Sequence, residues 1–299
     1  MDLDWWYIGE LVVNGANAGL MYSLVALGIV LIYKASGVAN LAQGALVMTG
    51  GYVVLALAYD AGLPMWLVIP LSMVILFFFG MGIERIALRR MAGQPLIMII
   101  MLTLGLEILL RGIVPAVWDR GGESPIIPLT LPADSIFIGD MLINTSYLLG
   151  GVIAIFLVIL FVYFFRTRIG VVSRAVSDDP VAAWSVGISV ERSIALSWGL
   201  AAVVSAIAGA LWGSIQGVDW TLSLLLLKAV AVAILGGLDS IIGAILAGFM
   251  LGIAENLAAG FLDDIVGGGT KELVVASVIL LTILIRPHGM FGREDIERI

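Results

Sequence analysis

The stretch from Leu148 to Phe165 reads LLGGVIAIFLVILFVYFF, with no charged residue and no alternation of polar with apolar positions. A helix needs about 20 predominantly apolar residues to cross a bilayer. The strands of an outer-membrane barrel would instead alternate within segments of about ten residues. This stretch, together with Leu273–Ile285, therefore predicts membrane-spanning helices and argues against a barrel.

The composition extends this interpretation to the whole chain. Of the 299 residues, 61% are hydrophobic and 12% are charged, whereas a soluble domain is nearer half apolar and a quarter charged. The apolar excess and the absence of cysteine exclude a disordered chain, a secreted disulfide scaffold and an ordinary cytosolic enzyme. The sequence predicts an all-α, polytopic integral membrane protein whose residues 1–299 form one transmembrane domain.

Apolar stretches between charge clusters predict about nine hydrophobic segments, within a range of about eight to ten. They are 11–33, 38–58, 64–84, 95–115, 144–165, 193–215, 222–237, 241–261 and 272–286. Acidic rather than basic residues precede the first segment, so we expect no cleavable signal peptide. The first segment is then itself a span.

Basic residues predict the orientation, because short cytoplasmic loops of membrane proteins collect Lys and Arg. Nine spans place eleven basic residues on one side of the membrane. These are Lys34, Arg85, Arg89, Arg90, Arg166, Arg168, Arg174, Arg192, Arg286, Arg293 and Arg298. Arg120 and Lys271 fall on the opposite side. We therefore expect a multi-pass protein of a bacterial-type cytoplasmic (inner) membrane, with its N-terminus outside and its C-terminus in the cytoplasm.

Two loops between the predicted segments are long. The outer loop, 116–143, contains Pro125, Pro128 and Pro132 and predicts a stiff extracytoplasmic segment. In the inner loop, 166–192, two acidic residues precede Pro180 and a glycine follows, the pattern of a short capped helix over 180–186. Its length of about 10 Å cannot span a bilayer, so it must lie at the surface.

The apolar side chains of this predicted helix leave two interpretations open. They are Val181, Trp184 and Val186. The helix could insert into a groove on a cytoplasmic partner. It could also rest on lipid headgroups as an amphipathic surface segment.

Four blocks of the sequence resemble those of permease subunits in ABC importers of branched-chain (hydrophobic) amino acids, the shorter of two permease types. In chain order they are Asn40–Gly44, Arg166–Gly187, Leu235–Gly243 and Arg286–Gly292. The first block is usually Asn-Phe-Ala-His-Gly, from which Leu41 and Gln43 depart. In the third block Gly is commoner than Asp239. The last block closely matches the family's Arg-Pro-x-Gly-Leu-Phe-Gly ending.

The resemblance implies a subunit of an ATP-driven importer that moves a branched-chain or other hydrophobic amino acid, or a related small organic solute. The implied partners are a second permease of the longer type, two cytoplasmic ATPase subunits, an extracytoplasmic substrate-binding protein and the lipid bilayer, with no nucleic acid. ATP and Mg²⁺ would bind the ATPase subunits, because this chain lacks a Gly-x-x-x-x-Gly-Lys-Ser/Thr loop. We expect no cofactor, catalytic residue or metal site on the chain itself.

The resemblance also implies that loop 166–192 couples the permease to the ATPase subunits. The expected coupling residues are Arg174, Asp178, Asp179, Pro180, Val181, Ala183, Trp184, Val186 and Gly187.

Two Gly-interrupted segments, 38–58 and 222–243, lie at corresponding places in the two halves, which often indicates a transporter's binding site. Broken helices expose backbone groups that suit the charged groups of an amino acid. The predicted translocation path contains Asn40, Gln43, Gly44, Gly236 and Gly237. Asn14 and Asn17 are weaker candidates. Close helix packing is the alternative interpretation of each glycine.

Ionisable residues inside the predicted spans suggest either structure or function. Glu107 and Arg111 are four residues apart and predict an intramembrane ion pair with a structural role. Lys228 and Glu255 have no partner that the sequence identifies, and we expect Lys228 to extend toward the interface.

A second class of function also fits: an ion-coupled secondary transporter of small organic solutes. Its coupling group would be Glu107, Glu255 or Lys228. The predicted surface helix favours the importer, because a self-sufficient carrier has no evident use for one.

Overall fold

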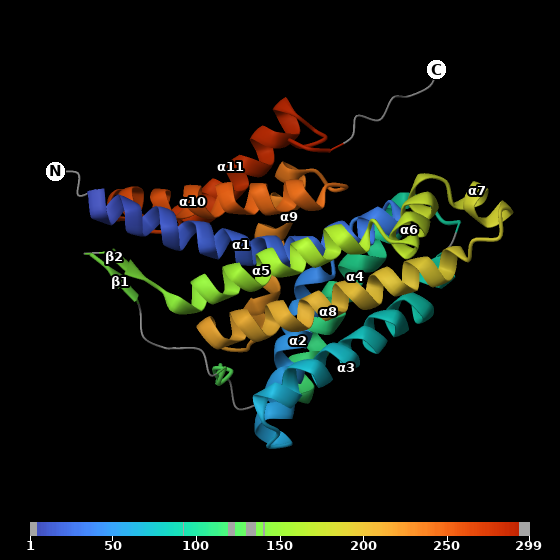
Figure 1. Ribbon diagram of the computed structural model, residues 1–299, viewed down its shortest axis with the longest axis horizontal. Coiled ribbons are helices and arrows are strands. Elements are labelled where there is room, and N and C mark those ends of the chain that lie inside the picture. Colours follow the sequence, from blue (N-terminus) through green and yellow to red (C-terminus); the bar gives the residue numbers. More distant parts are fainter. Residues whose placement is uncertain (1–4, 92, 119–122, 130–135, 140, 293–299) are drawn as a thin grey trace. The chain divides into compact units, whose positions relative to one another are not determined.

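The computed structural model describes residues 5–91, 93–118, 123–129, 136–139 and 141–292, which are mostly helical (Figure 1). The α-helices are α1 (Trp5–Ser36), α2 (Gln43–Leu55), α3 (Met65–Ile86), α4 (Leu96–Val117), α5 (Thr145–Phe164), α6 (Arg168–Asp178), α7 (Pro180–Ser185), α8 (Val190–Gln216), α9 (Leu225–Gly236), α10 (Ile241–Val266) and α11 (Thr270–Ile285). A π-helical turn, η1 (Ala56–Asp60), and the 3₁₀-helices η2 (Leu88–Met91) and η3 (Trp220–Leu224) extend or join them. Strand β1 (Ile136–Ile138) pairs antiparallel with β2 (Met141–Ile143).

Six helices within the described ranges are long and apolar enough to cross a membrane: α1, α3, α4, α5, α8 and α10. Each of the nine predicted segments coincides with a helix, but α2, α9 and α11 have only 13, 12 and 16 residues. A 13-residue helix is about 20 Å long, less than the hydrocarbon core of about 30 Å. The all-α membrane fold is confirmed, whereas the predicted count exceeds the six because non-helical residues precede α2 and a 3₁₀ turn precedes α9.

The predicted outer loop 116–143 is only partly described. Its residues 119–122, 130–135 and 140, with Arg120 and Pro132 among them, lie outside the described residues, as do Arg293 and Arg298. The described part has no regular secondary structure over 123–129, and its residues 136–138 and 141–143 form the β1–β2 hairpin.

The chain forms two compact units. Unit 1 comprises residues 1–26, 131–160 and 227–299, and unit 2 comprises residues 27–130 and 161–226. Helices α1, α5 and α9 therefore contribute to both units.

Unit 1 is built on a contact between the backbones of α1 and α10. A Cβ atom added to Gly15 would lie 2.6 Å from the carbonyl oxygen of Gly252. Small residues at such contacts let membrane helices approach closely. The β-hairpin is tied to α1 by Asn14, whose Nδ2 donates to the Leu142 carbonyl at 2.8 Å and whose Oδ1 accepts from the Asn144 N–H at 3.0 Å.

Unit 2 is organised around α2, all of whose residues are buried. Helices α3, α4 and α8 pack around it. Close backbone approach again requires glycine, since a Cβ on Gly50 would lie 2.7 Å from the Ser205 carbonyl oxygen of α8. The helix that is too short to span a membrane is thus the core of its unit.

We predict that Gly50→Ala lowers the free energy of unfolding by about 1–3 kcal/mol, because the added methyl group forces α2 and α8 apart. Gly105→Ala is the matched control, since a Cβ at this α4 position meets nothing within 4 Å. Thermal unfolding of the purified protein in detergent measures both. Equal melting temperatures for the two variants would contradict the tight contact.

Candidate functional site

The inner loop contains two helices, α6 and α7, of which the sequence predicted only the second. Asp179 caps α7, because its Oδ1 accepts hydrogen bonds from the N–H groups of Val181 and Ala182, both at 2.9 Å. Pro180 occupies the first helical position and Gly187, with a φ of +84°, follows the helix end. The helix covers Pro180–Ser185, one residue less than 180–186.

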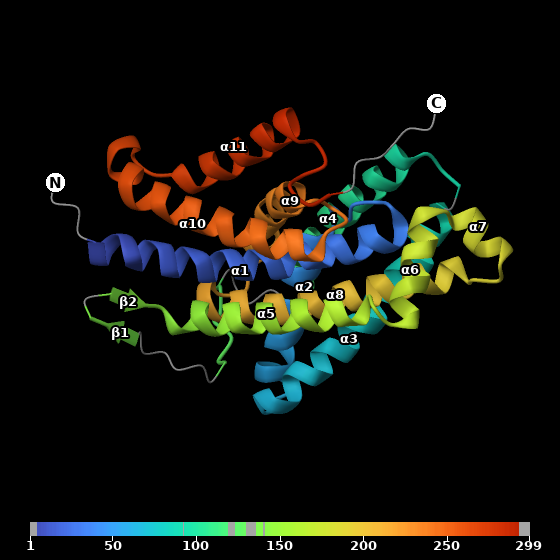
Figure 2. The same ribbon diagram turned by 45° about the horizontal axis from the view of Figure 1, so that its top comes forward.

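Helix α7 and its C-cap residue expose the three apolar side chains singled out in the sequence. Val181, Trp184 and Val186 are 76%, 75% and 75% exposed, whereas Ala183 is buried. Helix α6 supports this apolar tip, and its Ser173 accepts a hydrogen bond at 3.1 Å from Ser193 of α8. Both α6 and α7 pack on α8 (Figure 2). The result is an apolar protrusion fixed to a long helix.

The unwound residues before α2 are held by buried amide side chains. Asn40 and Gln43 are fully buried. The Oδ1 of Asn40 accepts from the Ala42 N–H at 2.9 Å, and its Nδ2 donates to Gln43 Oε1 at 3.3 Å. Gln43 Nε2 in turn donates to Ser205 Oγ at 2.9 Å. Two predicted path residues thus connect the start of α2 to α8.

Glu107 of α4 caps α2 from a different helix. Its Oε2 accepts from the Ala45 N–H at 2.7 Å, and its Oε1 accepts from Arg111 Nη2 at 3.2 Å. The N-cap residue of α2, Ala42, supplies no side-chain hydrogen bond. A carboxylate is favourable at this end of a helix because the unpaired N–H groups carry partial positive charge. The ion pair therefore also stabilises the beginning of α2.

The remaining predicted path residues lie at close backbone contacts within each unit. A Cβ on Gly44 would lie 2.7 Å from Leu226 Cβ, and one on Gly236 would collide with the backbone of Gly243. Gly237 has a φ of +96°, which favours glycine. The last two carbonyls of α9, from Leu235 and Gly236, accept hydrogen bonds from the N–H groups of Met290 and Phe291.

Lys228 and Glu255, which the sequence left without partners, pair with each other in unit 1. Lys228 Nζ lies 3.0 Å from Glu255 Oε2 and 3.1 Å from Tyr22 OH, above the tyrosine ring. Glu255 is 2% exposed. The expectation that Lys228 extends toward the interface is wrong, because its ammonium group turns to a buried carboxylate. The only signal in the sequence was the opposite charge of two isolated residues in apolar segments.

Glu84, which is 2% exposed, forms an ion pair with Arg89 at 3.3 Å. Arg89 in turn approaches Glu191 at 4.0 Å.

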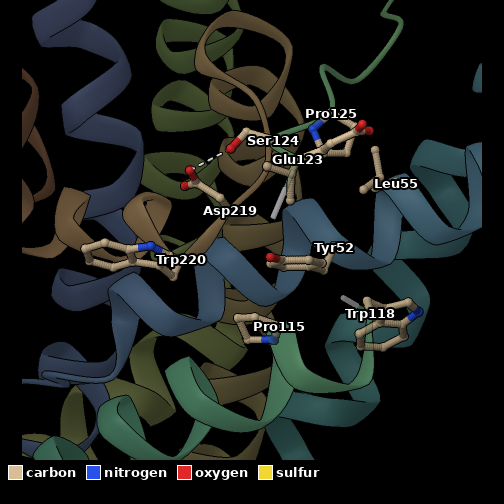
Figure 3. A pocket seen from close by; sticks show the side chains of 10 residues that line it. Tyr52, Leu55, Pro115, Trp118, Glu123, Ser124, Pro125, Asp219 and Trp220 are labelled. Atoms are coloured by element: carbon tan, nitrogen blue, oxygen red, sulfur yellow. Dashed lines mark hydrogen bonds between the residues drawn. The ribbon is translucent and has the colours of Figure 1, made fainter. Parts of the chain in front are cut away.

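A pocket of about 220 Å³ in unit 2 was not predicted (Figure 3). Four segments line it: Tyr52 and Leu55 of α2, Pro115 and Trp118 at the end of α4, residues 123–125, and residues 218–220. Ser124 donates a hydrogen bond of 2.8 Å to Asp219 Oδ2, and the two side chains lie next to each other in the lining (Figure 3). Tyr52 lies between Trp220 and Trp118 in this view. The residues come from positions far apart in the chain, so no local motif could reveal the pocket.

Comparison with known proteins identifies the family. The family model described as branched-chain amino acid transport system / permease component matches residues 11–285. The chain belongs to this family. The permease is 31% identical to the high-affinity branched-chain amino acid transport system permease protein BraD of Pseudomonas aeruginosa, over 98% of each chain. It is 28% identical to the LivH permease protein of Escherichia coli K12, over 100% of each chain.

A solved structure, PsaBC from Streptococcus pneumoniae in complex with Fab, aligns with the permease at a TM-score of 0.45 and 18% identity. The alignment covers 94% of this chain and 92% of that chain.

Family membership decides the class of function. The chain is a transmembrane permease subunit of the ABC importer type and not an enzyme, as the resemblance implied. The membership decides against an ion-coupled secondary transporter. The groups that such a carrier would need, Glu107, Glu255 and Lys228, are all bound in ion pairs.

We predict that Lys228→Met lowers the free energy of unfolding by about 3–5 kcal/mol, because Glu255 loses its buried counter-charge. The double variant Lys228→Met/Glu255→Gln should recover most of this loss, since neither buried charge remains. Thermal unfolding in detergent measures both. A double variant as unstable as the single one would show that the charge pairing is not the cause.

Proposed function

We propose that the permease carries a branched-chain or other hydrophobic amino acid, or a related small organic solute, across a bacterial-type cytoplasmic membrane. Two ATPase subunits supply the energy and bind ATP and Mg²⁺, while this chain holds no cofactor. A second permease of the longer type and an extracytoplasmic substrate-binding protein complete the importer. The names of BraD and LivH support the cargo class. The exposed apolar face of α7 is the observation that supports an ATPase partner.

Helix α7 suits a groove on a protein better than a lipid surface. Burying Val181, Trp184 and Val186 would gain about 1.5–3 kcal/mol for each side chain. Asp178 and Asp179 immediately precede α7 in the chain. Since the cytoplasmic leaflet is negatively charged, these carboxylates oppose docking to lipid and favour a protein partner. Arg174, Ala183 and Gly187 complete the proposed coupling surface.

A continuous set of contacts within unit 2 links α7 to the predicted path. Helix α7 packs on α6 and α8, and Ser173 joins α6 to Ser193 at the start of α8. Farther along α8, Ser205 accepts the hydrogen bond from Gln43. A push on α7 would therefore move the anchor of Asn40, Gln43 and Gly44. We keep Gly236 and Gly237 in the proposed path, because α9 ends there in the second of the two Gly-interrupted segments.

We propose the positive-inside orientation for this assembly, with the N-terminus and loop 116–143 outside and the inner loop 166–192 in the cytoplasm. Loop 116–143 then receives the substrate-binding protein. Ile126 and Pro128 are exposed parts of this surface. The substitutions Ile126→Arg and Pro128→Arg test this docking surface, and the measurement is how strongly the binding protein stimulates ATP hydrolysis. Stimulation that persists in the variant would contradict the surface.

We predict that Trp184→Asp reduces ATP-driven leucine uptake at least about tenfold in membranes that contain all subunits, because a charge cannot enter an apolar groove. Membrane insertion and docking of the binding protein should be unchanged, since the Trp184 side chain is exposed and supports no other helix. Trp184→Phe, which keeps an aromatic ring, is the matched control and should retain uptake. Normal leucine uptake by Trp184→Asp would overturn the coupling role of α7.

A further inference from the structure

Among the residues that the structure describes, those that line the pocket of unit 2 carry only negative charges. Glu123 and Asp219 are the charged side chains among the lining residues, and neither Lys nor Arg is among them. Asp219 is fixed by neutral donors: Ser124 Oγ on its Oδ2, and the N–H and hydroxyl groups of Thr221 on its Oδ1. These hydrogen bonds orient the carboxylate at the N-terminal end of η3, and none of the donors is a cation. Its environment among the described residues therefore favours a positively charged ligand.

The aromatic side chains of the pocket favour the same kind of ligand. The rings of Tyr52 and Trp118 lie 6.4 Å apart at an angle of 24°, and Trp220 is 51% exposed at the other side of Tyr52 (Figure 3). The faces of aromatic rings attract cations through their quadrupoles. Trp118 also follows the C-terminal end of α4, where the helix dipole attracts positive charge. Three independent effects thus select a cation.

The size and the apolar walls of the pocket limit that cation to a small organic one. A volume of about 220 Å³ is more than ten times the roughly 10–15 Å³ that a cavity needs to hold one water. Leu55, Pro115 and Val218 supply apolar lining. A bare metal ion would use neither the volume nor the apolar surface.

We propose that this pocket binds the ammonium group of the transported solute, whose apolar body contacts Leu55, Pro115 and Val218. Asp219 and Glu123 attract the ammonium group, and Tyr52, Trp118 and Trp220 surround it. The pocket adjoins the segment that the positive-inside orientation places outside. The inference thus rests on the proposed function and deepens it: the cargo is an amine or a zwitterionic amino acid rather than a neutral or anionic solute.

Three probes with the same branched apolar body test the charge preference: leucine, 3-methylbutylamine and 4-methylpentanoate. Their binding is measured by calorimetry on the permease, purified in lipid nanodiscs with its co-purifying subunits and without binding protein. The amine and leucine should bind at least about tenfold more tightly than the carboxylate, because only they carry an ammonium group. Equal affinities for the three probes would overturn the inference.

Variants locate the binding. Asp219→Asn should weaken binding of the amine about tenfold, since it removes the charge but keeps an oxygen that can cap Thr221. Glu123→Gln and Trp118→Leu should each weaken it by about threefold or more. Asp264→Asn, at an exposed position of α10 outside the pocket, is the matched control and should leave affinity unchanged. Affinity for the amine that is unaffected by all three pocket variants would also overturn the inference.

A separate readout distinguishes this inference from the proposed function. Stimulation of ATP hydrolysis by the binding protein tests the importer assembly without reference to the pocket. Normal stimulation together with no binding of the amine would reject the pocket alone. No stimulation of the wild-type assembly would reject the proposed function itself.

Discussion

The cost of leaving a polar or charged group unpaired away from water explains several of the contacts in this structure. A buried polar or charged group without a partner costs several kcal/mol, and lipid offers no partner. Helix α2 begins inside its unit, so its first N–H groups depend on other segments. Glu107 provides one acceptor and is balanced by Arg111, while Asn40 and Gln43 hold the preceding turn. The pair of Lys228 with Glu255 follows the same rule in unit 1.

The sequence predicts features that depend on neighbours in the chain and misses those that depend on distant ones. Apolar runs locate the helices, and Pro180 with Gly187 locates α7. The sequence also places Glu107 within reach of Arg111, one turn away. Lys228 and Glu255 are 27 residues apart on different helices, and Ser124 and Asp219 are 95 apart. Their meeting depends on packing, which no local pattern encodes. The predicted count of about nine exceeds the six long helices because apolar character does not show where a helix stops.

The described contacts connect the two ends of the proposed mechanism within a single unit. The exposed tip at α7 and the buried amides before α2 are both attached to α8, which extends over 27 residues. The acidic, aromatic pocket lies beyond the C-terminal part of the same helix, where 218–220 follow it. Helix α8 has α7, the proposed ATPase contact, near its first turn and the solute-sized pocket beyond its last turn. A movement of α8 could therefore link ATP hydrolysis to binding of the solute.

The hydrogen bonds from Met290 and Phe291 to the end of α9 show that the final described residues stabilise this helix. These two N–H groups satisfy carbonyls that a helix otherwise leaves open. A truncation before Met290 would thus expose bare acceptors at a helix end, whereas a purification tag or fluorescent fusion attached beyond Gly292 leaves those bonds intact. The segment that contains Met290 and Phe291 therefore caps the C-terminal end of α9.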